Sequence, residues 1–231
     1  MYTYAIGDIH GKLAMLVNLM GKINADANGE DYKLVFVGDY IDRGENSRGV
    51  LDFIIDLKKH RAERGLETIT LMGNHEDMAV NDEFKDSWIM NGGDKTLKSY
   101  PDYVIFPEHI EFMKSLDLYH ETEKNIFVHA AAAPNVPMNE QSRTMLMWSR
   151  YRYEEQSGLP KVLVHGHTPC KHVEQTHDRV NLDTGAVFGV HGYGTLTAAK
   201  IDRSTGQPVS FIQEKEDAID RIRQVDLKDD F

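Results

Sequence analysis

The first half of the chain alternates short apolar runs with segments in which apolar residues recur every three or four positions. The runs at 2–6, 34–37 and 69–72 predict strands. Two helices are expected between them, with apolar residues at Leu13, Leu16, Val17, Met20 and Ile23 and at Val50, Phe53, Ile54 and Leu57. Strands that alternate with helices in this way favour an α/β fold.

The second half is richer in strands. Its apolar runs predict strands at 126–128, 162–164, 180–182, 196–201 and 209–212. We expect these strands to form a second sheet packed against the first. The intervening segment 84–117 has a mostly helical pattern, with Pro107 at the start of a helix, and its apolar positions indicate packing rather than chemistry.

Length and composition indicate one globular domain. The chain has 231 residues, of which 41% are hydrophobic and 27% are charged, and these values allow a core to form. The end of the chain is dense in charge, so we predict a single domain over 1–213 and a charged tail over 214–231. The sequence contains no coiled-coil heptad and no apolar interface stripe, which favours a monomer.

The charge, the apolar runs and the cysteine content exclude several classes of protein. The net charge of −11 argues against nucleic-acid binding, because a polyanion would be repelled over most of the surface. The chain has neither the roughly 18-residue apolar stretch of a membrane span nor a signal-peptide pattern, so we expect a cytoplasmic protein without a membrane partner. Its single cysteine, Cys170, excludes an internal disulfide and a cysteine-based metal cage. Any metal ion would therefore need oxygen and imidazole ligands.

Residues that can bind metal ions follow the predicted strands, where open α/β sheets place their ligand sites. The first strand is followed by a Gly-Asp-Ile-His-Gly motif, in which the Asp8 carboxylate and the His10 imidazole can converge on one ion. The second is followed by a Gly-Asp-Tyr-Ile-Asp-Arg-Gly motif. There Asp39 could bridge two ions, Asp42 offers a second carboxylate, and the Arg43 guanidinium suits bidentate contact with phosphate.

Later strands end in further candidate ligands. The third strand is followed by a Gly-Asn-His-Glu motif, in which the Asn74 amide oxygen can bind a metal ion and His75 remains free as a proton donor. Two strands of the second half end in His129 and in a His-Gly-His-Thr motif that contains His167. Their neutral imidazoles would complete a second metal position.

Each of these residues also has an ordinary explanation when it is taken alone. Asp8 or Asp39 could cap a helix, His10 could be an exposed loop histidine, and Arg43 could pair with Glu45. Helix capping does not require an asparagine followed by a histidine after the third strand. The order of the motifs after successive strands therefore favours a metal site.

Together, these motifs resemble the calcineurin-like metallophosphoesterase superfamily, and specifically its phosphoprotein phosphatase branch of bacterial and phage type. The resemblance extends from about Tyr2 to Gly189. It implies a metallophosphatase-like α/β fold, a β-sandwich of two mixed sheets flanked by helices on both sides.

The resemblance implies a dinuclear metal centre. The implied ligands are Asp8, His10 and Asp39 for one ion and Asp39, Asn74, His129 and His167 for the other. It favours manganese, and iron or zinc also suits this set of ligands.

Catalytic and phosphate-binding roles also follow from the resemblance. It implies that His75 is the general acid, oriented by Asp42, and that Arg43 binds phosphate. A second phosphate-binding residue, Arg150, belongs to a Leu-Met-Trp-Ser-Arg segment that resembles the corresponding part of bacterial and phage members. The implied reaction is direct in-line attack of a metal-bridging hydroxide on phosphorus, without a phosphoenzyme.

The predicted function is therefore that of a metal-dependent serine/threonine protein phosphatase. Its expected substrates are phosphorylated proteins or small phosphoesters, and phosphotyrosine in proteins is a further candidate substrate. A close alternative is hydrolysis of diadenosine tetraphosphate or another dinucleoside polyphosphate, because relatives with similar metal motifs carry out this reaction. An alternative from a different class is a non-catalytic binding module that keeps the fold.

The chain departs from the family pattern at two places. Alanines occupy 130–133, directly after His129, where many members have glycine, and this removes conformational freedom beside a ligand. The segment 190–194 is longer than the usual glycine turn, and we expect it to bring His191 or Tyr193 near the rim of the cleft.

Other polar and aromatic residues are assigned structural roles. His165 is off the family register, so we expect a hydrogen-bonded core residue rather than a ligand. We expect surface positions for His60, His109, His120, His172 and His177. Trp88 and Trp148 are expected to be packing anchors, and the segments 91–97 and 181–187 are interpreted as structural loops around the site.

Overall fold

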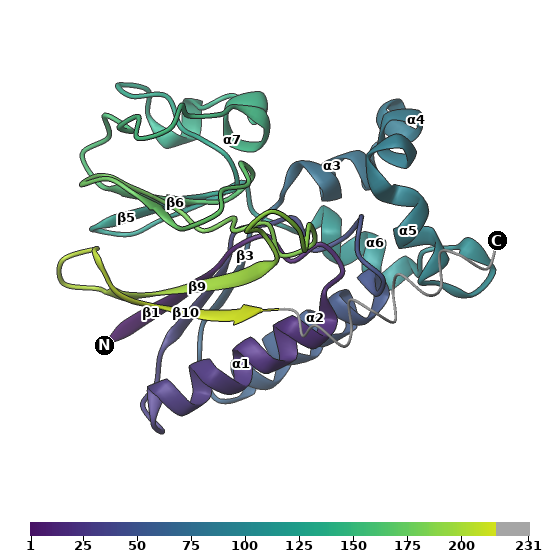
Figure 1. Ribbon diagram of the computed structural model, residues 1–231, viewed down its shortest axis with the longest axis horizontal. Coiled ribbons are helices and arrows are strands. Elements are labelled where there is room, and N and C mark those ends of the chain that lie inside the picture. The colour runs from purple at the N-terminus through teal and green to yellow at the C-terminus, as the bar shows by residue number, and fades with distance from the viewer. Residues whose placement is uncertain (216–231) are drawn as a thin grey trace.

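The computed structural model describes residues 1–215 and contains two mixed five-stranded sheets (Figure 1). The first sheet has the strand order β10-β9-β1-β2-β3, and the second has the order β4-β5-β6-β8-β7. The first consists of β1 (Tyr2–Ile6), β2 (Lys33–Phe36), β3 (Thr68–Thr70), β9 (Thr195–Asp202) and β10 (Pro208–Lys215). The second consists of β4 (Tyr119–Glu121), β5 (Asn125–Val128), β6 (Val162–His165), β7 (Glu174–Gln175) and β8 (Arg179–Asn181). The predicted fold class is confirmed.

Strands β9 and β10 belong to the first sheet, so the expectation that they help to form the second sheet is wrong. β9 runs antiparallel to β1, with Thr3 opposite Ile201, and β10 pairs with β9. An apolar run indicates a strand but not its partner, and here the chain returns to cover the free edge of β1. Because β10 ends at Lys215, the first two residues of the predicted tail are part of the sheet, and the remainder, 216–231, lies outside the described residues.

Helices cover both outer faces of the pair of sheets (Figure 1). α1 (Leu13–Ala27) and α2 (Ser47–Glu63) lie along the first sheet, and α7 (Arg143–Trp148) lies over the second. α3 (Asn74–Val80), α4 (Lys85–Trp88), α5 (Asp94–Lys98) and α6 (Pro107–Lys114) gather at the end of the molecule shown on the right of Figure 1. In the described part of the chain, no helix is long and apolar enough to cross a membrane.

The segment 84–117 is more broken than its helical pattern predicts. α4 is followed by a π-helical turn, Ile89–Gly93, and then by α5 and a 3-10 turn, Pro101–Tyr103. Gly92 has a φ of 106°, which interrupts the helical path. The start of α6 at Pro107 is confirmed.

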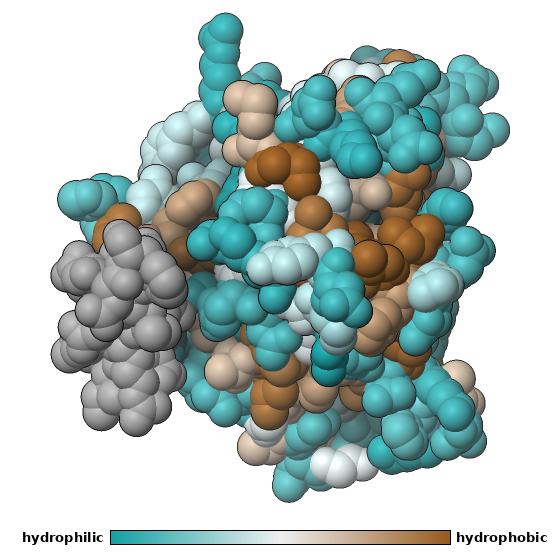
Figure 2. All heavy atoms as spheres, turned by 90° about the vertical axis from the view of Figure 1, so that its right-hand side faces the viewer, coloured by the Kyte–Doolittle hydropathy of each residue, from teal (hydrophilic) through white to brown (hydrophobic). Residues whose placement is uncertain are grey.

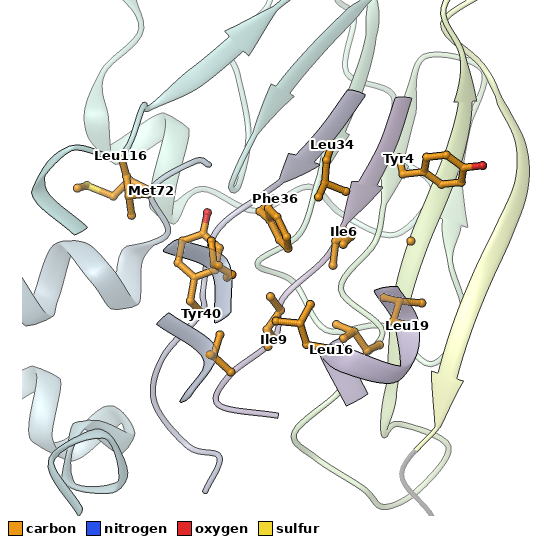
Figure 3. Packing of buried hydrophobic residues seen from close by; sticks show 14 of the residues in the cluster. Tyr4, Ile6, Ile9, Leu16, Leu19, Leu34, Phe36, Tyr40, Met72 and Leu116 are labelled. Carbon is orange, nitrogen blue, oxygen red and sulfur yellow. The ribbon is translucent and has the colours of Figure 1, made fainter. Parts of the chain in front are cut away.

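The core consists of two apolar layers that follow the alternation of side chains along the strands. Ile6, Leu34 and Phe36 face the helices and pack with Leu16 and Leu19 of α1 (Figure 3). The side chains of opposite parity, with those of the second sheet, fill the space between the sheets. They include Ala5, Val35, Val37, Phe127, Val164 and Val180. Because β1, β2 and β3 are parallel, their carboxyl ends meet at one edge of the sheet, and the loops that carry the motifs meet there too.

Candidate metal centre

All six predicted metal ligands are buried and lie just beyond the ends of strands, five of them in loops and one at the start of a helix. The loop after β1 supplies Asp8 and His10, and the loop after β2 supplies Asp39. Asn74 is the first residue of α3, while His129 and His167 follow β5 and β6. None of the six is more than 7% exposed.

Five of the polar residues at the site have a left-handed backbone conformation that side chains other than glycine rarely adopt. They are His10, Asp39, Asp42, Arg43 and His167, with φ between 46° and 73°. Each such conformation costs on the order of 1 kcal/mol or more, so surrounding contacts must hold it in place. Strain of this kind concentrates at functional sites.

Glu76 holds the strained loop after β2 in place. Its carboxylate accepts hydrogen bonds from the backbone N–H groups of Asp39 (2.9 Å), Tyr40 (2.7 Å), Ile41 (3.2 Å) and Gly73 (3.1 Å). Burial, followed by the charge of Asp39, raises the pKa of Glu76 to about 7. Sequence reasoning placed Glu76 in the third motif without a role, since the bonds to Asp39, Tyr40 and Ile41 join residues that are far apart in the chain.

The first group of candidate ligands consists of His10, Asp39 and His75, whose ligand atoms lie within 4.8 Å of one another. His10 Nδ1 donates to the Ile41 carbonyl oxygen at 2.8 Å, so Nε2 keeps its lone pair and faces Asp39 Oδ2 at 3.5 Å. Arg43 Nη1 donates to the same Nε2 atom at 2.8 Å. The first group thus contains two imidazoles and a carboxylate, and the predicted phosphate-binding arginine contacts one of the imidazoles.

The second group consists of Asp39, His129 and His167, with Asn74 between them. His129 Nδ1 donates to the Val37 carbonyl oxygen (3.0 Å) and His167 Nε2 donates to that of Trp148 (3.2 Å). Their other ring nitrogens therefore carry lone pairs, and both lie 3.0 Å from Asn74 Oδ1. Asp39 Oδ1 lies 3.4 Å from His129 Nε2. Acceptor atoms that converge in this way are satisfied by a cation.

Burial and the charge of Asp39 act on the pKa values of the candidate histidines. At His129 burial lowers the pKa, but the charge of Asp39 outweighs this effect, so the net pKa is raised. Burial lowers the pKa of His10 well below the usual value, and it lowers the pKa of His167 to about 3, with smaller effects from His129 and Arg150. Both imidazoles are therefore neutral at pH 7, which is the form that binds metal ions. Burial and the charge of Asp183 raise the pKa of Asp8.

Asp8 is not a member of either group, but its carboxylate accepts the backbone N–H of His167, a member of the second, at 3.0 and 3.2 Å. Gly166 makes this approach possible, because a Cβ atom at that position would lie 1.9 Å from Asp8 Oδ1. Asp183, which sequence reasoning placed in a structural loop, is buried nearby, and burial raises its pKa to about 6. Buried carboxylates in such number require compensating positive charge. The residues present therefore fit a centre of two divalent ions that share Asp39.

His75 and Asp42 form a hydrogen-bonded pair at the edge of the first group. His75 Nδ1 donates to Asp42 Oδ2 at 2.6 Å, and His75 Nε2 lies 4.0 Å from Asp39 Oδ2. Asp42 is fully buried and also accepts hydrogen bonds from Trp88 and Thr96. Burial raises the pKa of Asp42, and the hydrogen bonds to His75, Thr96 and Trp88 oppose this shift. The geometry allows Nε2 to give a proton to a group bound beside the candidate ligands.

The two predicted phosphate-binding arginines differ in their surroundings. Arg43 contacts His10 and has its guanidinium 5.7 Å from the centre of the Phe188 ring. Arg150 lies just beyond α7, where its side chain is exposed. Tyr193 packs against Phe188, the residue beside Arg43, and sequence reasoning did not single out Phe188. The approach of the segment 190–194 to the rim of the cleft stays a prediction.

Several other predicted residues can be placed. His165 is buried and accepts a hydrogen bond from Arg179 at 3.1 Å, as a structural residue would. The surface position expected for His109 is wrong, because this side chain is buried between Tyr100 and Asp52. His120 is half-buried, while surface positions are confirmed for His60, His172 and His177.

The alanines at 130–133 do not distort the loop after β5. In the part of the chain that the structure describes, none of them has a left-handed backbone conformation. Ala130 N donates to the Leu146 carbonyl oxygen at 2.8 Å, in an arrangement that any residue can adopt. Glycine is not needed beside His129 in this protein.

The family model for calcineurin-like phosphoesterases matches residues 1–194. The chain belongs to the calcineurin-like phosphoesterase family. It is therefore a metal-dependent hydrolase of phosphoesters, and the two His–Asp groups are its candidate metal positions.

Relatives in this family differ in the substrates that their names specify. The chain is 28% identical to serine/threonine-protein phosphatase 1 of Salmonella typhimurium, over 87% of this chain and 92% of that protein. It is 27% identical to the asymmetrical bis(5'-nucleosyl)-tetraphosphatase PrpE of Bacillus thuringiensis, over 91% of this chain and 96% of that protein. Its fold is similar to that of a protein serine/threonine phosphatase from Saccharomyces cerevisiae, with a TM-score of 0.64 and 18% identity over 94% of this chain and 80% of that one.

Proposed function

We propose that this calcineurin-like phosphoesterase is a phosphomonoesterase that acts on phosphoserine and phosphothreonine in proteins. The observation that carries the proposal is that Asp39 belongs to both His–Asp groups, with the His75–Asp42 pair beside them. A centre of two ions next to a proton donor suits attack by water on a phosphomonoester. The similarity to a serine/threonine phosphatase over most of the chain supports the substrate class.

In this proposal six residues hold the metal ions. Asp8, His10 and Asp39 hold one ion, and Asp39, Asn74, His129 and His167 hold the other. Two divalent ions, for which we propose manganese with iron or zinc as substitutes, supply Lewis acidity towards the phosphate and lower the pKa of bound water.

The other residues bind the phosphate and move a proton. The guanidinium groups of Arg43 and Arg150 bind non-bridging phosphate oxygens and offset the charge that spreads over them in the transition state. His75 Nε2 gives its proton to the leaving oxygen as the bond from phosphorus to that oxygen breaks. Asp42 accepts the Nδ1–H group and so holds the His75 ring in the orientation that this transfer requires. The proton leaves from the imidazolium form, which carries a proton on each ring nitrogen and whose charge Asp42 offsets.

The test measures release of phosphate from a phosphoserine peptide by EDTA-stripped protein, before and after manganese is added. We expect turnover only with manganese, and His75→Asn should lower kcat by roughly a hundredfold or more while two ions remain bound. The exposed His172→Asn serves as the matched control and should keep the parent activity. Full activity in His75→Asn would remove His75 from the mechanism.

The second candidate is hydrolysis of a dinucleoside tetraphosphate, which the similarity to the PrpE protein favours. The values of kcat/KM for a phosphothreonine peptide and for diadenosine tetraphosphate, measured on the same preparation, decide between the two. A kcat/KM at least about tenfold higher for the peptide supports the protein phosphatase. The reverse preference would assign the site to the dinucleotide, and metal-dependent turnover of either substrate excludes a non-catalytic binding module.

A further inference from the structure

The π-helical turn between α4 and α5 lies against the loop that carries the proposed catalytic residues. The Gly92 carbonyl oxygen accepts the Arg43 backbone N–H at 3.2 Å, and a Cβ atom on Gly92 would lie 2.8 Å from Arg43 Cγ. Trp88, the last residue of α4, is buried with 6% of its surface exposed, whereas Met90 in the turn is 86% exposed. Figure 2 shows this side of the molecule, where apolar side chains are interspersed with polar ones. π-helical turns are rare and occur frequently at functional sites.

Two residues that flank this turn bind the carboxylate of Asp42. Trp88 Nε1 lies 2.9 Å from Oδ2 and 3.0 Å from Oδ1. The Thr96 hydroxyl donates to Oδ1 at 2.6 Å and accepts the backbone N–H of Asp42 at 2.9 Å. Together with His75 on Oδ2, these contacts give donors to both oxygens of a side chain that is fully buried.

These contacts satisfy the hydrogen-bonding capacity of the Asp42 carboxylate and also restrain its orientation. Because the Thr96 hydroxyl binds both the main chain and the carboxylate of Asp42, it fixes the rotamer of that side chain. Because the indole N–H of Trp88 contacts both oxygens, it fixes the plane of the carboxylate. Gly93 leaves room for the indole ring, since a Cβ atom there would lie 2.6 Å from it. Rotation of the carboxylate would break these bonds and would turn Oδ2 away from His75.

We propose that Trp88 and Thr96 are positioning residues for the proton transfer, which act by holding the Asp42 carboxylate in the orientation that directs His75 Nε2 at the leaving oxygen. This inference rests on the proposed function. In the step concerned, water forms a new bond to phosphorus and the bond to the leaving oxygen breaks. That oxygen keeps the electron pair and takes the proton from Nε2. Neither positioning residue touches the substrate.

The experiment compares two substrates that differ in their need for a proton donor. Phenoxide leaves with the help of a proton, whereas 2,4-dinitrophenoxide is stable as an anion and leaves without one. In manganese-loaded protein, Trp88→Phe should lower kcat for phenyl phosphate roughly tenfold and kcat for 2,4-dinitrophenyl phosphate less than about twofold, with KM unchanged for both. Phenylalanine keeps an aromatic ring in the site and removes the N–H donor together with part of the volume of the indole, and the comparison of the two substrates separates the loss of the donor from a general loss of packing.

Thr96 provides a matched pair of variants. Thr96→Val removes the hydroxyl at nearly constant shape and should reproduce the selective loss on phenyl phosphate, whereas Thr96→Ser keeps the hydroxyl and should restore the parent rate. The backbone N–H of Asp42 retains the Ser47 hydroxyl as an acceptor at 3.0 Å, which favours folding of the valine variant. Equal rates in Thr96→Val and Thr96→Ser would overturn the assignment of Thr96.

A double-variant cycle tests whether Trp88 acts through Asp42. If it does, adding Trp88→Phe to Asp42→Asn should cause no further loss on phenyl phosphate. Equal losses on the two substrates, or independent effects in the double variant, would overturn the inference and leave Trp88 with a structural role. A parent protein that hydrolyses neither substrate with manganese would refute the proposed function itself, so the two failures are distinguishable.

Discussion

The two sheets contribute to the site in different ways. The loops of the first sheet carry Asp39 and Asp42 in strained conformations, and the side chain of Glu76 binds several of their backbone N–H groups. The second sheet supplies His129 and His167 directly after β5 and β6, and each histidine is oriented by a single hydrogen bond from its ring to a backbone carbonyl oxygen. The first half of the site is held by a buried polar network, and the second half is held mainly by the strands that precede it.

This difference predicts how far the effect of a substitution extends through each half of the site. In the first half a single carboxylate satisfies groups on several segments, so its loss leaves several buried donors without partners. In the second half the ring of His129 and the ring of His167 each donate to one backbone carbonyl oxygen, so the loss of either contact remains local. Three substitutions, taken in order of their expected effect, test this contrast.

The largest effect is expected where the two halves meet, at Asp39. Asp39→Asn removes the only charged group that belongs to both His–Asp groups, and we expect activity to fall by about a thousandfold. The bound metal should fall below two ions per chain. Assays with manganese, together with mass spectrometry of the native protein, measure both quantities. The exposed Asp31→Asn is the matched control. Two tightly bound ions in Asp39→Asn would contradict the shared position.

A smaller effect, on stability, is expected for Glu76 in the first half. Glu76→Gln replaces one carboxylate oxygen by an NH₂ group. This group is a donor, so the backbone N–H groups that bind the oxygen in the parent protein lose their acceptor. We expect the free energy of unfolding of the metal-free protein to fall by about 3 kcal/mol. Urea denaturation measures this loss, with the exposed Glu30→Gln as its control. A loss no greater than that of the control would show that the network does not hold the loop.

The smallest effect is expected for Asp178, in the turn before β8 of the second sheet. Its carboxylate accepts hydrogen bonds from Ser157, Gly158 and Thr176. Burial raises the pKa of Asp178, but these hydrogen bonds outweigh it, so the net pKa is below the usual value. A carboxyl group whose pKa is lowered on folding stabilises the protein above its unfolded pKa, and this stability is lost as pH falls through the folded pKa.

Asp178→Asn should therefore lower the free energy of unfolding by about 1 kcal/mol at pH 7, and its difference from the parent should shrink as the pH falls below about 4. Urea denaturation at several pH values measures this difference. Activity should stay close to that of the parent, because the hydrogen bonds of the Asp178 carboxylate go to Ser157, Gly158 and Thr176 and not to a candidate ligand. A difference from the parent that does not change with pH would rule out ionisation of Asp178 as the cause.

The sequence predicted the elements and the edge of the sheet at which the site lies, because both depend on local patterns. The predicted strand at 2–6 matches β1, and the motifs after β1, β2 and β3 meet because these strands are parallel. The apolar pattern of 196–201 could not reveal that β9 pairs with β1, since a strand has the same periodicity in either sheet. The short strands β4 and β7 were missed because they contain few apolar residues.

The predicted ligands converge, but the residues that hold the catalytic loop were not predicted. Trp88 carries an apolar ring and was expected only to pack, although its N–H group binds Asp42. Thr96 and Glu76 reach the same loop from distant positions in the chain. Their roles depend on tertiary contacts, which cannot be predicted from the spacing of residues or from composition. The N–H group of a buried tryptophan needs a hydrogen-bond acceptor. The prediction that Trp88 is a packing anchor could therefore have prompted a search for its acceptor.

The pairing of β1 with β9 determines when the protein can fold during its synthesis. Thr3 faces Ile201, so β1 leaves the ribosome long before β9, the strand that pairs with its second edge. Until then β1 presents unpaired N–H and C=O groups to other chains, which is a site for misassembly. Contacts between residues so distant in sequence also slow folding. A ribosome-bound chain that stops before residue 195 should therefore lack the completed first sheet, even though every proposed metal ligand has already been translated.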